Sequence, residues 1–155
     1  PLHADPLVAA NRLLDASGTA ANFQRRTVLQ ANAIIRHYQV IVGSSADATL
    51  PRSIREAIAA CYTRVYHWDN FADGVAHILA SKLSPQQMRL LTDFYLSRGL
   101  PPYEIEAFKA TIAMATEIER ASADFILANS DSCVEQDAVL ILRYLRTRPR
   151  ASASD

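Results

Sequence analysis

Apolar residues recur at intervals of three and four along almost the whole chain, which is the spacing of one face of an α-helix. The pattern predicts a first helix that begins at Asp5-Pro6, with Asp5 as N-cap and Pro6 as the first helical residue, and ends at Gly18. A second helix is expected over 19–42, with Gly43 as its stop. The N-terminal third of the chain is therefore predicted to be helical.

The rest of the chain repeats this period after clear start signals. A helical pattern opens at Pro51 and continues to Leu83, with an interruption at Asp69-Asn70. Ser84-Pro85-Gln86-Gln87 then combines an N-cap serine, an N1 proline and a capping-box glutamine before the next helix. This start signal indicates that a new helix begins directly after the previous one ends.

Two further helices are expected towards the C-terminus. One runs from Pro101-Pro102 to Phe125-Ile126, and the other from a second capping box at Ser132–Glu135 to Pro149. No stretch shows the strict alternation of a β-strand. The pattern predicts an all-α, single-domain antiparallel bundle of six or seven helices over residues 5–149, with 1–4 as a signal-peptide remnant or disordered start and 150–155 as a frayed tail.

Composition narrows the class of protein. The chain has 155 residues, half of them hydrophobic, no formal net charge and only 4 glycines. Disorder needs low hydrophobicity and high net charge, and a nucleic-acid binder usually carries excess positive charge. We therefore expect a folded domain with no nucleic-acid partner, and no transmembrane segment because no apolar run approaches ~18 residues.

The N-terminus and the cysteines bear on the cellular compartment. Leu2-His3-Ala4 has the form of the end of a signal-peptidase site, although an N-terminal remnant of other origin fits as well. Cys61 and Cys133 lie far apart and neither belongs to a C-x-x-C pair, which argues against zinc. In an exported chain they would form one disulfide worth about 4 kcal/mol. In a cytosolic bundle they would be two buried thiols.

One segment resembles a known family. Residues 71–108 read FADGVAHILASKLSPQQMRLLTDFYLSRGLPPYEIEAF and are similar to the core of domain-of-unknown-function family 2059. The resemblance is carried by a helix–turn–helix pattern at Leu83–Met88, Leu91, Phe94-Tyr95, Ser97 and Gly99. Gln87 departs from it, because the family usually has an acidic residue there. The resemblance implies an exported bacterial helical protein, and it assigns no catalytic residue.

Candidate chemistry is sparse. Asp69, Asp73 and His77 are four residues apart and would share one face of a continuous helix, as two carboxylates and an imidazole that hold a metal do. No H-x-x-x-H pair accompanies them, and a solvated i,i+4 pair is the simpler interpretation. Cys61 and His67 lie on different faces of their helix. We therefore predict no metal site, no cofactor and no catalytic site.

Two groups of residues are candidates for an interaction surface. Tyr62, Tyr66 and Trp68 form an aromatic cluster, of the kind that is enriched at interfaces, although core packing also accounts for it. Arg143 and Arg146 belong to a basic C-terminal patch, which fits phosphate or acidic groups but also complements the helix dipole.

These observations predict a periplasmic or secreted protein that is not an enzyme. Its expected role is to bind another macromolecule in the cell envelope, most simply a protein, as an inhibitor, an immunity-type partner or an accessory factor. A homodimer is a second form of association that the surface allows. The alternative is a carrier that holds a lipid or another apolar small molecule in a cavity between helices.

Overall fold

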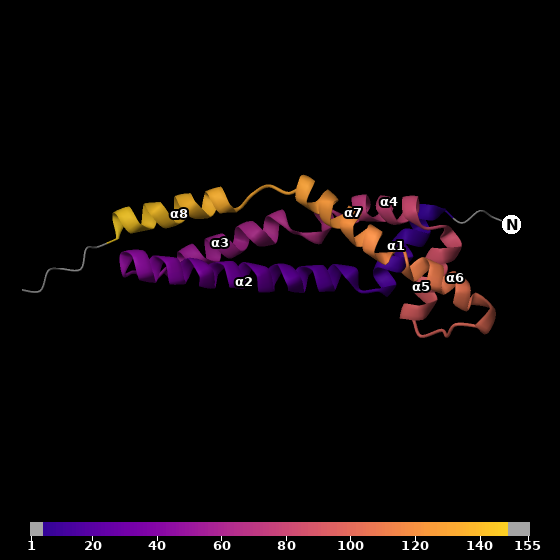
Figure 1. Ribbon diagram of the computed structural model, residues 1–155. Helices are drawn as coiled ribbons and strands as arrows, with labels where there is room; N and C mark the ends of the chain where they lie inside the picture. The colour runs from indigo at the N-terminus through magenta and orange to yellow at the C-terminus, as the bar shows by residue number, and fades with distance from the viewer. Residues whose placement is uncertain (1–4, 149–155) are drawn as a thin grey trace, which may run out of the picture. The chain divides into compact units, whose positions relative to one another are not determined.

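The computed structural model describes residues 5–148, and within that range it contains helices and no strand (Figure 1). The all-α prediction is therefore confirmed. The expected signal-peptide remnant at 1–4, the helix stop at Pro149 and the tail at 150–155 lie outside the described residues. The α-helices are, in chain order, α1 (Pro6–Ala16), α2 (Thr19–Ala46), α3 (Arg52–Val65), α4 (Ala72–Lys82), α5 (Pro85–Tyr95), α6 (Ile105–Ile112), α7 (Ala115–Ala128) and α8 (Val134–Thr147).

The helices fall into two compact units. The first unit contains the described residues up to Gln24 together with Trp68–Ser130, and the second contains Arg25–His67 and the described residues from Asp131 onwards. Residues of α2 belong to both units.

The first unit is built around contacts of α1 with α4 and α5. Ala10 and Leu13 of α1 are buried with Ala76 and Leu79 of α4 and with Met88 of α5. This unit also contains two short helices, η1 (Trp68–Asn70) directly before α4 and η2 (Pro102–Glu104) between α5 and α6. This core is apolar on every contributing face, as hydrophobic burial requires.

The second unit packs α2, α3 and α8 around their own core. Its centre includes Ala31 and Val42 of α2, Ile58 of α3, and Ile141 of α8. Cys61 and Cys133 belong to the same cluster.

The predicted N-caps of α1 and α5 are confirmed. Asp5 Oδ1 accepts a hydrogen bond from the backbone N–H of Leu7 at 2.9 Å. Ser84 and Gln87 form the complete capping box, in which Gln87 N–H donates to Ser84 Oγ at 3.2 Å and Ser84 N–H donates to Gln87 Oε1 at 2.9 Å. These side chains satisfy N–H groups that the first helical turn leaves unpaired.

Three expected boundaries differ from the structure. Gly43 lies inside α2, which continues to Ala46 and ends before Asp47, a residue with a left-handed φ of 48°. The predicted helix from 101 to 126 is divided into η2, α6 and α7, with the break at 113–114. The N-cap of α8 is Cys133 rather than Ser132, so the second capping box does not form, and Ser132 Oγ accepts from Val134 N–H at 3.3 Å.

Candidate interaction surface

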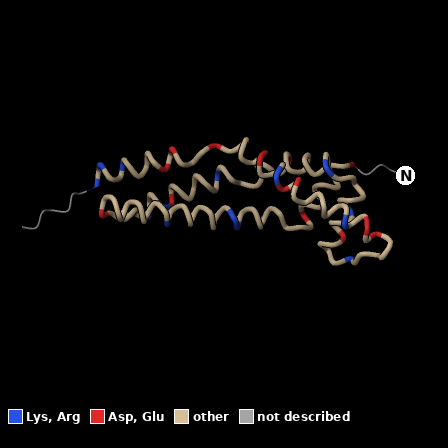
Figure 2. Tube along the Cα trace, viewed as in Figure 1, with Lys and Arg blue, Asp and Glu red and all other residues tan. Residues whose placement is uncertain are grey.

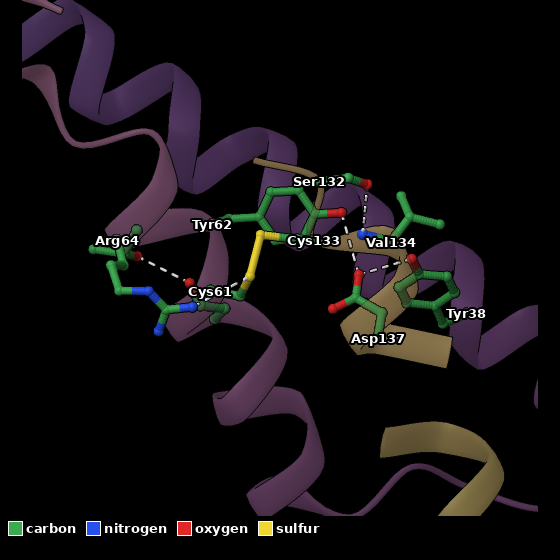
Figure 3. Close-up of a disulfide and its surroundings, with 10 residues drawn as sticks. Tyr38, Cys61, Tyr62, Arg64, Ser132, Cys133, Val134 and Asp137 are labelled. Carbon is green, nitrogen blue, oxygen red and sulfur yellow. Dashed lines mark hydrogen bonds between the residues drawn. A yellow bond between two sulfur atoms is a disulfide. The ribbon is translucent and has the colours of Figure 1, made fainter. Parts of the chain in front are cut away.

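A disulfide joins α3 to the start of α8 in the second unit, as the cysteine pattern predicted. Cys61 lies in α3 and Cys133 directly precedes α8, their Cα atoms are 6.0 Å apart, and both residues are buried (Figure 3). A guanidinium nitrogen of Arg64, Nη2, lies 3.8 Å from Cys61 Sγ. The bond therefore fixes the N-terminus of α8 against α3.

One turn after Cys133, a fully buried carboxyl group holds three helices together. Asp137 Oδ2 accepts hydrogen bonds from Tyr38 of α2 at 2.8 Å and from Tyr62 of α3 at 3.2 Å (Figure 3). Its other oxygen, Oδ1, is buried without a hydrogen-bond partner among the described residues. A buried carboxyl that is only half satisfied costs stability and is unusual in a native core.

Burial changes the acidity of all three groups. Desolvation raises the pKa of Asp137, against the two tyrosine hydrogen bonds that lower it. Burial and then the nearby Asp137 carboxyl raise the pKa of Tyr62 to about 12, and the same causes raise the pKa of Tyr38. Asp137 therefore binds a proton more readily than an exposed aspartate does, and both tyrosines hold their protons more tightly.

Sequence reasoning missed Asp137, although one signal points to it. Cys133, Asp137 and Ile141 are four residues apart, so they share the face of α8 that faces the core. Apolar spacing in α8 also includes Val139 and Leu142, but these positions do not face the core. These two side chains are 53% and 51% exposed.

The outer face of α8 therefore carries apolar and basic side chains together. Val139, Leu142, Arg143, Arg146 and Thr147 line an open depression of about 360 Å³. We call these five residues the α8 surface. Both arginines are exposed, as the sequence predicted for an interaction surface.

Of the aromatic residues expected at that surface, two are buried. Tyr62 is buried, and its hydroxyl donates a hydrogen bond to Asp137. Trp68 is buried against Phe23, and their ring centroids are 5.3 Å apart. Tyr66 is half-buried and stacks on Tyr62 at 6.1 Å. Core packing, the other interpretation of this cluster, therefore holds for Tyr62 and Trp68.

The three residues considered for a metal site are separated by a break in the helix. Asp69 lies in η1, whereas Asp73 and His77 lie in α4. His77 Nδ1 donates to the backbone carbonyl of Asp73 at 2.7 Å. Within residues 5–148 no group of three His, Cys, Asp or Glu side chains is placed to hold a metal ion.

Charge is divided unevenly between the two units. Among the described residues, the second unit has nine arginines and five acidic residues, and the first has six basic and ten acidic residues. Figure 2 shows where these charged residues lie along the chain. The zero net charge of the chain therefore hides four excess positive charges on one unit and four excess negative charges on the other. The fully buried Asp137 is one of the five acids, so the surface of the second unit is more basic than the count indicates.

Comparison of the chain with protein-family models, curated proteins and solved structures gives no match. None of the described helices is long and apolar enough to span a membrane. The geometry and charge of the second unit are therefore the observations on which a functional proposal rests.

Proposed function

We propose that this is an exported, non-enzymatic protein that binds an acidic macromolecular partner in the cell envelope through the α8 surface. The observation that carries the proposal is the exposure of Val139 and Leu142 beside Arg143 and Arg146. Aliphatic contact combined with guanidinium groups suits a partner that offers both apolar side chains and carboxylates.

Export is supported by the disulfide. Disulfides persist in oxidising compartments and are rare in the cytosol. The Cys61–Cys133 bond is buried in the core of the second unit. The resemblance of residues 71–108 to family 2059 implies the same compartment.

The inner side of α8 supports its role as a rigid binding element. The disulfide at Cys133 and the hydrogen bonds of Asp137 to Tyr38 and Tyr62 attach the first turns of the helix to α2 and α3. Further along, Tyr144 donates to the Thr49 carbonyl at 3.1 Å and Arg148 donates to the Ala46 carbonyl at 2.8 Å. A surface that is already ordered loses less conformational entropy when it binds.

The alternative expectation, a carrier of an apolar ligand, gains no specific support from two depressions on the described residues. The one on α8 is open and lined by Arg143 and Arg146. The other, in the first unit, is open as well and is lined by Arg12, Asp15 and Arg98 beside smaller residues. Carrier sites are mostly apolar and enclose most of the ligand.

The proposal is tested by charge reversal on α8. Wild type, the double variant Arg143→Glu/Arg146→Glu, and a matched control Arg52→Glu/Arg55→Glu on the exposed side of α3 are each used to capture cross-linked partners from native envelope. We expect wild type and control to recover the same protein, and the α8 variant to lose it. Recovery of that protein by both double variants, or its loss from both alike, would contradict the proposal.

A further inference from the structure

The exposed face of α2 carries arginines and aliphatic side chains that have no part in the proposed function. Arg26, Leu29, Ala33, Arg36 and Val40 fall within an arc of about 80° at 3.6 residues per turn. All five belong to the second unit and are exposed, with Leu29 61% and Val40 67% exposed. We call these residues the α2 face.

The α2 face carries two arginines and no acidic side chain. The 28 residues of α2 contain three arginines and no Asp or Glu, as can be followed along the chain in Figure 2. The helix dipole does not account for these arginines, because the last turn of α2 contains no basic residue. This distinguishes Arg26 and Arg36 from Arg146, which lies in the last turn of α8.

The charge of the α2 face decides what kind of partner fits it. A second copy docked through the same face in an antiparallel pair would bring Arg26 and Arg36 of both copies to one interface, where the α2 face offers no acidic side chain to neutralise them. An anionic surface would instead neutralise Arg26 and Arg36 together. The occupant that complements this face is therefore negatively charged.

The side chains between the arginines favour lipid over protein. Interface anchors sit in well-packed pockets, and the α2 face, unlike the α8 surface, contributes no side chain to either of the two depressions described above. Helices that lie on membranes combine cationic residues with aliphatic ones, and an arginine can rest its stem on apolar surface while its guanidinium binds phosphate in a bidentate manner. The α2 face has this arrangement.

We propose that the α2 face binds the phosphate headgroups of an anionic lipid bilayer through Arg26 and Arg36, with Leu29 and Val40 at the boundary of the acyl chains. The contact is peripheral and reversible. Each arginine near an anionic membrane contributes about fivefold to the partition coefficient. Binding should weaken as salt is added, because the attraction falls off within a Debye length.

The test is cosedimentation of the full chain with vesicles of phosphatidylglycerol and phosphatidylethanolamine, compared with phosphatidylcholine vesicles. We expect wild type to bind the anionic vesicles only. Arg26→Gln/Arg36→Gln should lower the partition coefficient about 25-fold, whereas the control Arg52→Gln/Arg55→Gln on α3 should retain most of the binding. Leu29→Ser/Val40→Ser should weaken binding without changing its dependence on salt.

Circular dichroism of each variant checks that it is folded, which is expected because every altered side chain is exposed. Equal binding of wild type to both kinds of vesicle, no binding to either, or equal losses in the α2 and α3 variants would overturn the proposal. Binding to soluble polyglutamate as strong as to vesicles, unaffected by Leu29→Ser/Val40→Ser, would assign the α2 face to an acidic polypeptide instead. The α2 and α3 variants leave the α8 surface unchanged, so comparing them tests this proposal separately from the proposed function.

Discussion

At the scale of single residues, the ring of Phe125 leaves no room for a side chain at Gly74. Gly74 lies in α4, and a β-carbon added to it would overlap the Phe125 ring of α7. That ring also makes an edge contact with Phe71, with centroids 6.4 Å apart. The sequence showed a glycine inside a helical stretch, but the partner that requires it lies 51 positions away.

Replacing a glycine inside a helix by alanine usually stabilises a protein. At Gly74 the same replacement should destabilise it. Gly74→Ala should lower the free energy of unfolding by about 1–3 kcal/mol, because the ring of Phe125 must move. The matched control is Gly43→Ala in α2, where the nearest atom to a β-carbon is the Ala48 carbonyl oxygen at 3.9 Å. Thermal unfolding should show this control to be more stable by about 0.5–1 kcal/mol. Stabilisation by both substitutions would contradict the close packing.

Asp137 predicts a specific dependence of stability on pH. Because burial raises its pKa, the folded state binds the proton more tightly than the unfolded state. Raising the pH from the unfolded pKa of about 3.9 through the folded one must therefore lower the free energy of unfolding. Asp137→Asn removes this titration.

Urea unfolding at a series of pH values tests whether the free energy of unfolding falls as the pH rises. Relative to Asp137→Asn, wild type should lose stability steadily as the pH rises above about 4. The prediction fails if the difference in the free energy of unfolding between the two proteins stays constant with pH or changes in the opposite direction. Asp137 would then not titrate as its burial requires.

At the scale of elements, local sequence signals predicted helix starts better than helix faces. Asp5 and the Ser84–Gln87 box act through hydrogen bonds to neighbouring N–H groups, so the sequence alone contains the whole interaction. The orientation of α8 depends on Cys61 and Tyr62, which come from another helix. The disulfide and Asp137 hold the opposite side of α8 against the core. Val139 and Leu142 therefore face outward, although their apolar spacing favours burial.

The disulfide between α3 and α8 should account for a large part of the stability. It closes a loop with a sequence separation of 72 residues. Cys61→Ala/Cys133→Ala should lower the free energy of unfolding by about 4 kcal/mol in the chain-entropy model. Chemical denaturation of wild type in strong reductant should reproduce this loss, and a loss below ~1 kcal/mol in both experiments would contradict it.

At the scale of the whole molecule, charge separation is the feature that composition concealed. The sequence indicated a basic final helix, but the division into a basic and an acidic unit needed the fold, because residues 25–67 and 131–148 are brought together only there. The chain passes between the units three times, and the first passage, at 24/25, lies within the continuous helix α2, where no linker marks it. The arginines of α2 and α8 are thus part of one cationic unit, and this supports anionic partners for both proposed surfaces.

We propose that the α8 surface binds a protein partner in the envelope. The most direct measurement places a photo-crosslinking amino acid at Leu142 in the full chain, in its native cells, and compares it with the same probe at Leu127. Leu127 is an exposed leucine of α7 in the other unit and serves as the matched position. We expect one discrete protein adduct from position 142 that is absent from position 127. The same adducts from both positions, or none from position 142, would contradict it.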